Sequence, residues 1–363
     1  MIVEIATWVL YVLTMLVVVA YLIAGVGALC RKKSAQAKIF PKVSVVIAAK
    51  DEGSVMEDTL KALRKSDYQN MEIIVVSSDS ETAKIARKYA RVLMDNESKG
   101  KPHALNIGVK KARGEVLYFI DADCIVRRST IRKLVSALDE RHSSVVGTTI
   151  PRDADTFVAK SAAAQAAWLW IANYGLSAML GTVVVPWRNF AIYKKTLARI
   201  GYFKNVLTED INISHRLYSR NQKVAFVPEA ICSEDYPKKF SHYWKQQERW
   251  HAGFFAEQKN AARSMGFLRY FLIAAAAAAL SQPHLVAILF LVLYGLTNSV
   301  LFLYAFIVPV AAMIITAANI LKERSYYIPA VFILVAAISA ALMMASAKKT
   351  ICNERIAWYK TPR

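Results

Sequence analysis

The sequence contains little cysteine and no cysteine cluster. Its four cysteines are scattered along 363 residues, and no Cys-x-x-Cys pair occurs. Such spacing indicates neither a zinc site nor a disulfide framework. Scattered, unpaired cysteine is typical of a protein that faces a reducing cytosol.

Acidic residues are scarce relative to basic ones. The chain has 27 Asp and Glu against 47 Lys and Arg, a formal net charge of +20. The basic residues are interspersed rather than stacked with aromatic residues along one groove, which argues against a nucleic-acid binder. We interpret the charge as that of a membrane protein with a basic cytoplasmic domain. Anionic lipid head groups and a polyanionic nucleotide would both be attracted to such a surface.

Ionisable residues are absent from the middle of the apolar segments at both chain ends, apart from His284 near a break. Residues 5–29 form one apolar run, followed directly by Arg31-Lys32-Lys33. A cleaved signal peptide carries its positive charge before the apolar region, so we expect a retained anchor instead. Residues 267–321 and 327–347 fit about three further spans, and an even number would keep the basic tail in the cytosol.

These patterns divide the chain into three regions. We expect an N-terminal transmembrane anchor at residues 1–33, a cytosolic domain with an interfacial helix at residues 40–263, and a C-terminal transmembrane region at residues 264–363. The expected location is the cell membrane, with several spans and the large domain in the cytoplasm. The lack of ionisable residues within the spans argues against a proton-coupled transporter.

The middle region alternates short apolar runs with amphipathic stretches, which is typical of βαβ units and an α/β fold. Strands are predicted at residues 43–48, 71–76, 91–94 and 116–120, and each is followed by a cluster of polar residues. The carboxyl ends of parallel strands meet at one edge of a sheet, where open α/β folds bind ligands. We therefore expect the polar clusters to share that edge.

The fourth strand ends in two carboxylates, Asp121 and Asp123. Hard oxygen ligands at a sheet edge suit Mg²⁺ or Mn²⁺ carrying a phosphorylated substrate. A plain turn at the strand end is the alternative for this short pattern.

A second candidate is Asp210, in the first turn of a predicted helix that Thr208 would cap. Exposed backbone N–H groups and the helix dipole would hold the carboxylate ionised, which suits a general base. An ordinary first-turn acid is the other interpretation. Lys101 lies in a flexible basic loop that either contacts a diphosphate or is a solvated charged turn. Asp51 and Asp79 are either nucleoside contacts or turn residues.

A third pattern is Gln246-Gln247-Glu248-Arg249-Trp250. On a helix, Gln246, Arg249 and Trp250 fall on one face. Arginine is suited to a phosphate and tryptophan to the flat face of a sugar ring. An interfacial helix with Trp and Arg at lipid head groups is the alternative, and both can hold together.

Taken in order, Ala49-Lys50-Asp51-Glu52, Asp79, Lys99-Gly100-Lys101, Asp121-Ala122-Asp123, Thr208-Glu209-Asp210 and the Gln-to-Trp motif resemble family 2 glycosyltransferases. The resemblance covers about residues 43 to 255. Within the family the chain is similar to the membrane-integrated branch of cellulose, chitin, hyaluronan and poly-N-acetylglucosamine synthases, with ceramide glucosyltransferase as a related type.

The resemblance implies a GT-A (Rossmann-like) domain between transmembrane helices and inverting transfer from a nucleotide diphosphate sugar. It implies that Asp123 and Asp121 hold Mg²⁺ or Mn²⁺ and that Asp210 is the base. The implied donor-binding residues are Asp51, Asp79, Lys101, Asp121, Gln246 and Arg249, and Trp250 is implied to stack on the acceptor.

The function that these features favour is transfer of a sugar, from a UDP-sugar donor, to a growing polysaccharide at the membrane. The alternatives are a single transfer onto a lipid acceptor and a non-catalytic membrane subunit. Intact Asp121, Asp123 and Asp210 argue against the non-catalytic subunit.

Overall fold

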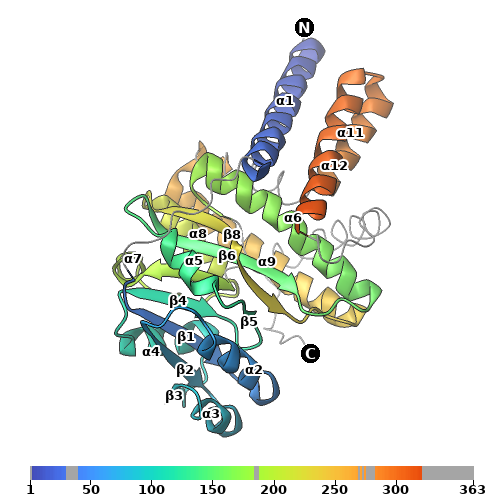
Figure 1. The fold of residues 1–363 in the computed structure, drawn as a ribbon. Helices are drawn as coiled ribbons and strands as arrows, with labels where there is room; N and C mark the ends of the chain where they lie inside the picture. Colours follow the sequence, from blue (N-terminus) through green and yellow to red (C-terminus); the bar gives the residue numbers. More distant parts are fainter. Residues whose placement is uncertain are drawn as a thin grey trace.

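The computed structural model describes residues 2–29, 40–183, 188–268, 270–271, 274 and 283–320. Its centre is an eight-stranded sheet in the order β3-β2-β1-β4-β7-β6-β8-β5 (Figure 1). The strands are β1 (Val43–Ala49), β2 (Met71–Ser77), β3 (Arg91–Met94), β4 (Val116–Ile120), β5 (Ile125–Val126), β6 (His142–Pro151), β7 (Asn189–Tyr193) and β8 (Lys223–Glu234). The predicted α/β fold is therefore present, with all four expected early strands.

The sheet is mixed rather than wholly parallel. β1 pairs in parallel with β2 and β4, β2 with β3, and β6 with β8. β7 runs antiparallel to β4 and β6, and β5 runs antiparallel to β8. The start of β7 consequently lies at the same sheet edge as the end of β4.

Helices cover both faces of the sheet. They are α2 (Gly53–Arg64), α3 (Ser80–Ala86), α4 (Lys101–Lys111), α5 (Thr130–Ser136), α6 (Phe157–Leu180), α7 (Lys194–Arg199), α8 (Glu209–Ser219) and α9 (Phe240–Met265). Alternate β1 residues enter opposite core clusters: Val45 packs with α2 residues and Val46 with α4 residues. This two-sided burial explains why the strands read as nearly continuous apolar runs.

One strand continues further than the sequence pattern predicts. The sequence pattern predicts a last strand at residues 223–227. In the structure β8 continues to Glu234, since the ladder with β6 shifts register between Gly147 and Thr148 and resumes at Ile231. The short elements α7 and β5 were also not predicted. The extension brings Glu234 to the edge of the sheet at which β4 ends and β7 begins.

A buried amide ties together the strands around this shift. Asn189 is 1% exposed and accepts a hydrogen bond from the Tyr118 hydroxyl at 2.9 Å. Its amide nitrogen donates to the carbonyls of Thr148 and Ala230 at 3.1 and 2.8 Å. Since buried polar groups must be satisfied, Asn189 fixes where β7 begins relative to β4, β6 and β8.

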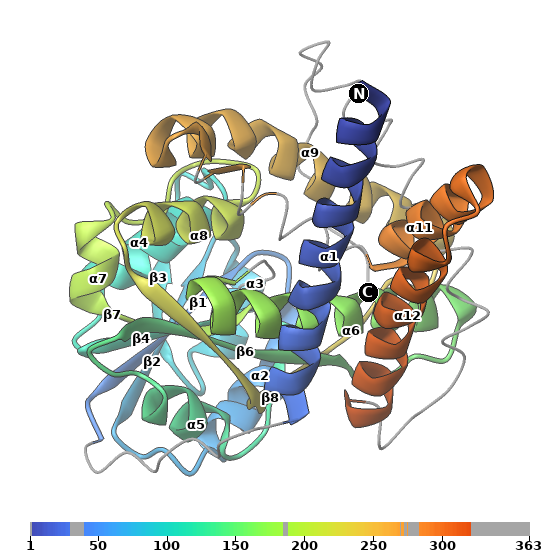
Figure 2. The same ribbon diagram turned by 90° about the horizontal axis from the view of Figure 1, so that it is seen from above.

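Three apolar helices stand together next to α6, at one end of the molecule: α1 (Ile2–Leu29), α11 (Pro283–Thr297) and α12 (Val300–Ile320) (Figures 1 and 2). They pack through Phe290, Phe302 and Ala305, and the Tyr11 hydroxyl donates to Ser299 Oγ at 3.3 Å. Trp8 on α1 and Leu296 on α11 are 69% and 76% exposed. The predicted helix at residues 5–29 is confirmed as a helix.

None of the helices in the described part of the chain combines the length and the apolarity needed to cross a membrane. The predicted span at residues 327–347 and the basic tail lie outside the described residues.

Asn189→Ala should lower the free energy of unfolding by about 3 kcal/mol, because it leaves two buried carbonyls and a tyrosine hydroxyl without their partner. Tyr118→Phe is the matched control: it removes one of the same hydrogen bonds and should cost about 1 kcal/mol. Thermal unfolding of the purified variants measures both. Equal unfolding temperatures for the two variants would contradict the role given to Asn189.

Candidate active site

The pairing of β4 with β7 brings together the carboxylate of Asp121 and the guanidinium of Arg188. Ile120 pairs with Asn189, so the next residue of β4 and the preceding residue of β7, Asp121 and Arg188, are neighbours. Asp121 Oδ2 lies 4.0 Å from Arg188 Nε, and Asp121 Oδ1 lies 2.7 Å from Lys101 Nζ. Asp121 therefore sits between two cations.

These pairs belong to a longer row of alternating charges, which we call the charge row: Glu234, Arg188, Asp121, Lys101 and Glu209. Arg188 Nη1 forms an ion pair with Glu234 Oε1, and Lys101 Nζ lies 3.0 Å from Glu209 Oε1. The row crosses the sheet edge from the end of β8 to the start of α8. Each interior member has an opposite charge on both sides, as burial of charges requires.

Lys101 is placed by a glycine turn. Gly100 has φ of 97°, a conformation that glycine adopts at little cost, and Lys101 is the first residue of α4. Burial opposes the charged lysine, but Asp121 and Glu209 outweigh it and raise the pKa of Lys101 above its ordinary value. Lys101 of the predicted basic loop is thus a cation held in one position at the sheet edge.

Asp210 lies in the first turn of α8, as predicted, beside Glu209 of the charge row. Burial and the neighbouring Glu209 raise the pKa of Asp210 to about 6, although the Ile211 N–H, Lys101 and Arg249 lower it. The Ile211 N–H donates to Asp210 Oδ1 at 2.8 Å. The helix start therefore supports the anion as expected, but burial outweighs that support. Asp210 is ionised at neutral pH and protonated in mild acid.

Thr208 precedes α8 as predicted, but its hydroxyl makes no capping hydrogen bond. It is 4% exposed because α9 packs on it: a Cβ at Gly253 would lie 2.2 Å from Thr208 Cγ2. Asn212 Nδ2 also donates to Glu257 Oε2 at 2.7 Å, from α8 to α9. These contacts hold the helix that carries the Gln-to-Trp motif against the start of α8.

Arg249 and Trp250 of the motif on α9 lie beside the charge row. Gln246 is 8% exposed, and burial together with Arg188 lowers the pKa of Arg249, although Glu209 and Asp210 oppose this. Arg249 Nε is buried without a hydrogen-bond partner in the described part of the chain. The Arg188 guanidinium lies over the Trp250 ring, 5.1 Å from its centroid. Basic, acidic and aromatic groups thus converge here.

A small cavity lies among these residues. It is lined by Lys101, Leu105, Phe119, Ile120, Asp121, Phe190, Phe203, Glu209, Asp210 and Ile213. Asn106 braces one wall, since its side chain exchanges two hydrogen bonds with the backbone of Phe203, at 2.9 and 3.1 Å. The cavity joins apolar walls to Lys101, Asp121 and Asp210.

The predicted nucleoside residues lie further along the same edge, at the ends of β1 and β2. Asp79 Oδ2 accepts the Asp51 N–H at 2.8 Å, and Asp79 Oδ1 accepts the Thr82 N–H at 2.7 Å. Burial opposes the anion, but these hydrogen bonds lower the pKa of Asp79. Asp51 adopts a φ of 53°, while its side chain is exposed. Asp79 therefore caps α3 and fixes the turn that presents Asp51.

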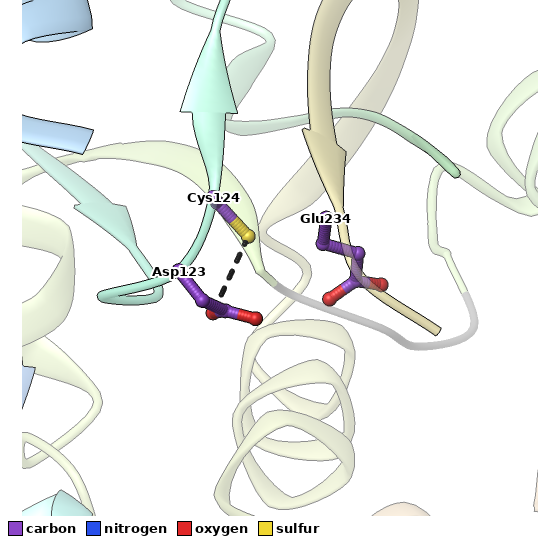
Figure 3. A group of neighbouring side chains, drawn as sticks. All are labelled: Asp123, Cys124 and Glu234. Carbon is purple, nitrogen blue, oxygen red and sulfur yellow. Dashed lines mark hydrogen bonds between the residues drawn. The ribbon is translucent and has the colours of Figure 1, made fainter. Parts of the chain in front are cut away.

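Asp123, Cys124 and Glu234 form a buried cluster whose side chains point into one space (Figure 3). The register of β5 and β8, with Ile125 opposite Ser233, explains why Cys124 lies beside Glu234. Arg152 Nη2 donates to the Asp123 carbonyl at 2.7 Å. One ligand atom from each of the three residues lies within 4.8 Å of the others.

The donor set of this cluster fits a hard divalent cation. Asp123 and Glu234 offer carboxylate oxygens beside Asp121, which suit Mg²⁺ or Mn²⁺. A hydrogen bond with Cys232 and burial raise the pKa of the Cys124 thiol well above its usual value, so it stays protonated. The predicted metal residues are compatible with the predicted metals.

Two residues of the site were missed by the sequence prediction, Arg188 and Glu234. In a parallel sheet, the residue before a strand lies at the edge opposite the ligand site, so Arg188 gave no signal. An antiparallel β7 reverses that placement. Glu234 was missed because the strand prediction stopped before Pro228.

With this geometry in place, sequence comparison identifies the domain. Residues 44–204 match the family model described as Glycosyl transferase family 2. The chain contains a family 2 glycosyltransferase domain. The mixed sheet, with its flanking helices, is the GT-A-like fold that the resemblance implied.

Curated relatives of this glycosyltransferase domain agree. The chain is 31% identical over 234 residues to "Probable glycosyltransferase YdaM" of Bacillus subtilis (strain 168), covering 60% of this chain and 56% of that protein. It is 27% identical over 222 residues to "Poly-beta-1,6-N-acetyl-D-glucosamine synthase" of Staphylococcus aureus (strain COL), covering 58% and 54%. The chain thus spans about half the length of the curated relatives it matches.

A solved structure shares the fold. It is described as "Mannosyltransferase PcManGT from Pyrobaculum calidifontis in complex with GDP-Man and Mn2+". Its TM-score to this chain is 0.58 at 20% identity, covering 95% of this chain and 100% of that one.

Gly253→Ala should lower the free energy of unfolding by about 1 to 3 kcal/mol, because the new methyl group would meet Thr208 Cγ2 and push α9 away from α8. Thermal unfolding measures the loss. Adding Thr208→Ser, which removes that methyl group, should restore part of it. An unchanged unfolding temperature in Gly253→Ala would contradict the close packing of these helices.

Proposed function

We propose that this protein is a membrane-bound, metal-dependent, inverting glycosyltransferase that moves a sugar from a UDP-sugar to a growing polysaccharide. The observation that carries the proposal is the convergence of Lys101, Asp121 and Asp210 on one cavity at the sheet edge. That cavity combines a cation, Lys101, for a leaving diphosphate with a carboxylate for an attacking hydroxyl. The names of the curated relatives support polysaccharide synthesis.

Asp210 is the proposed general base. With a pKa of about 6 it is ionised at neutral pH, yet basic enough to accept a proton from an acceptor hydroxyl. Lys101, Arg249 and Gln246 are proposed to bind the diphosphate, for which lysine and arginine supply charge-assisted hydrogen bonds. Asp51 and Asp79 are proposed to line the nucleoside pocket at the ends of β1 and β2.

Asp121 and Asp123 are proposed to hold Mg²⁺ or Mn²⁺. The ion would neutralise charge on the departing nucleoside diphosphate. Asp121 pairs with Lys101 and Arg188, and these cations balance the negative charge at this edge of the sheet.

Membrane attachment is proposed from the exposed apolar side chains. Trp8, Val12 and Leu16 on α1 are 57% to 69% exposed, and Leu296 on α11 is similarly open. Exposed apolar patches of this kind mark contact with lipid or protein. Positive charge on the proposed cytoplasmic domain would favour an anionic leaflet. An exposed apolar surface on the same molecule also favours the second candidate, a single transfer onto a lipid acceptor.

Purified, detergent-solubilised protein should release UDP from one UDP-sugar of a panel when Mn²⁺ or Mg²⁺ is present, and EDTA should abolish release. Asp210→Asn keeps the shape of the side chain but cannot accept the proton, so release should fall by about 10²-fold to 10⁴-fold. An assay of nucleoside diphosphate release from a panel of UDP- and GDP-sugars, with added membranes as a source of acceptor, measures it. No turnover of any UDP- or GDP-sugar would reject the enzyme in favour of the non-catalytic subunit.

Sizing of the radiolabelled product separates the two acceptors. A ladder of lengthening saccharides is expected for polysaccharide synthesis. A single organic-soluble glycolipid would establish the lipid acceptor instead.

The transfer rate should fall as the pH drops through about 6, because the raised pKa of Asp210 means that the base becomes protonated there. Glu209→Gln should move this acid limb to lower pH, since the Glu209 charge raises the pKa of Asp210. The pH profile of kcat/KM measures both. An acid limb at the same pH in both proteins would contradict the assignment of Asp210.

A further inference from the structure

We propose that Arg188 is a positioning residue that couples the metal and donor edge to the acceptor tryptophan, Trp250, with Glu234 as its anchor. The proposal rests on the proposed function and adds to it a residue outside the predicted motifs. Arg188 touches both halves of the site. Asp121 belongs to the donor edge on β4, and Trp250 belongs to α9.

The Arg188 guanidinium makes contacts both at its edge and on one face. Two carboxylates lie at its edge, with Glu234 at Nη1 and Asp121 4.0 Å from Nε, and the Trp250 ring lies over its face at 5.1 Å. Arginine alone among the basic residues is both a fork for carboxylates and a flat cation for an aromatic face. The guanidinium therefore fixes the orientation of Trp250 relative to Asp121.

The position follows from strand register rather than from a flexible loop. Arg188 directly precedes Asn189, whose buried amide is tied to β4, β6 and β8. Glu234 ends β8 and is 2% exposed. The Arg188 side chain is itself only 15% exposed, so its charge depends on the two carboxylates. Both ends of the contact are thus set by the sheet.

One consequence concerns the acceptor. Because Arg188 covers one face of the Trp250 indole, a sugar ring can stack only on the opposite face.

A second consequence concerns the metal. Arg188 balances Asp121 and Glu234, and as a cation it opposes Mn²⁺ at the neighbouring carboxylates.

Two substitutions separate these consequences. Arg188→Gln removes the charge and the fork. Arg188→Lys keeps the charge but loses the flat face. Arg113→Gln is the matched control. Arg113 is an exposed arginine that pairs with Glu72 at 3.2 Å. It lies before the start of β4, whereas the Asp121 that Arg188 contacts follows the end of β4.

The first readout is the affinity for Mn²⁺ alone. The electron paramagnetic resonance signal of the free ion measures how much Mn²⁺ remains unbound. Arg188→Gln should bind Mn²⁺ about tenfold more tightly, because one opposing charge is gone. Arg188→Lys and Arg113→Gln should stay within about twofold of the parent protein. Weaker binding in Arg188→Gln would overturn the charge-balancing part, since a purely structural role predicts loss of the metal site.

The second readout is tryptophan emission. Arg188→Lys should change the emission spectrum when Trp250 is present and leave it unchanged in a Trp250→Phe background. An unchanged spectrum in the parent background would overturn the contact with Trp250. This arm needs only the folded Lys variant, so it decides the question even if Arg188→Gln does not fold.

The third readout is steady-state transfer from UDP-N-acetylglucosamine to a short β-1,6-linked N-acetylglucosamine oligosaccharide. Arg188→Lys should raise the KM for the oligosaccharide up to about tenfold and leave the KM for the donor within about twofold. In the double variant Arg188→Lys/Trp250→Phe, the KM for the oligosaccharide should rise by less than the product of the two single fold-changes, because the residues act as a pair. Unchanged KM for the oligosaccharide, or fully additive effects, would overturn the coupling.

The arms distinguish this proposal from the proposed function. If the parent protein transfers no sugar, the proposed function fails, while Mn²⁺ binding and emission still decide the role of Arg188.

Discussion

The structure of the site depends on one electrostatic constraint, that carboxylates gathered at a buried sheet edge must be balanced before any ligand binds. Asp121, Glu209 and Glu234 meet this constraint through Lys101 and Arg188 in the charge row. A buried charge without a partner would cost several kcal/mol. The residues proposed to bind a metal and a diphosphate are therefore held in place by their own counter-charges, and the proposed binding would exchange one set of ions for another.

Packing between α8 and α9 places Asp210, the proposed base, among these charges. The lack of a side chain at Gly253 lets the two helices approach closely at Thr208, and Asn212 and Glu257 join them again one turn beyond. Asp210 consequently sits between the anionic Glu209 and the cationic Lys101 and Arg249. Its pKa is the balance of burial against those neighbours, so helix packing sets the pKa of the proposed base as much as its own motif does.

Local patterns predicted the parts of the molecule that depend on local sequence. The early strands, the first-turn position of Asp210 and the helical Gln-to-Trp motif follow from periodicity and spacing over a few residues. Arg188 and Glu234 do not, because their placement depends on strand direction and on a register shift between strands far apart in sequence. The position of Asp210 in the first turn of a helix correctly predicted a hydrogen bond from a backbone N–H, that of Ile211. Burial of Asp210, which raises its pKa, depends on how the helices pack and could not be predicted from the local sequence.

The central claim is that Asp210 activates an acceptor hydroxyl for one direct displacement at the anomeric carbon. A direct displacement inverts the configuration of the sugar, whereas attack by an enzyme nucleophile followed by a second displacement retains it. The most direct test is nuclear magnetic resonance of the freshly formed product, made from an α-linked UDP-sugar, to assign its new glycosidic bond. The account predicts a β-linked product, and an α-linked product would contradict it.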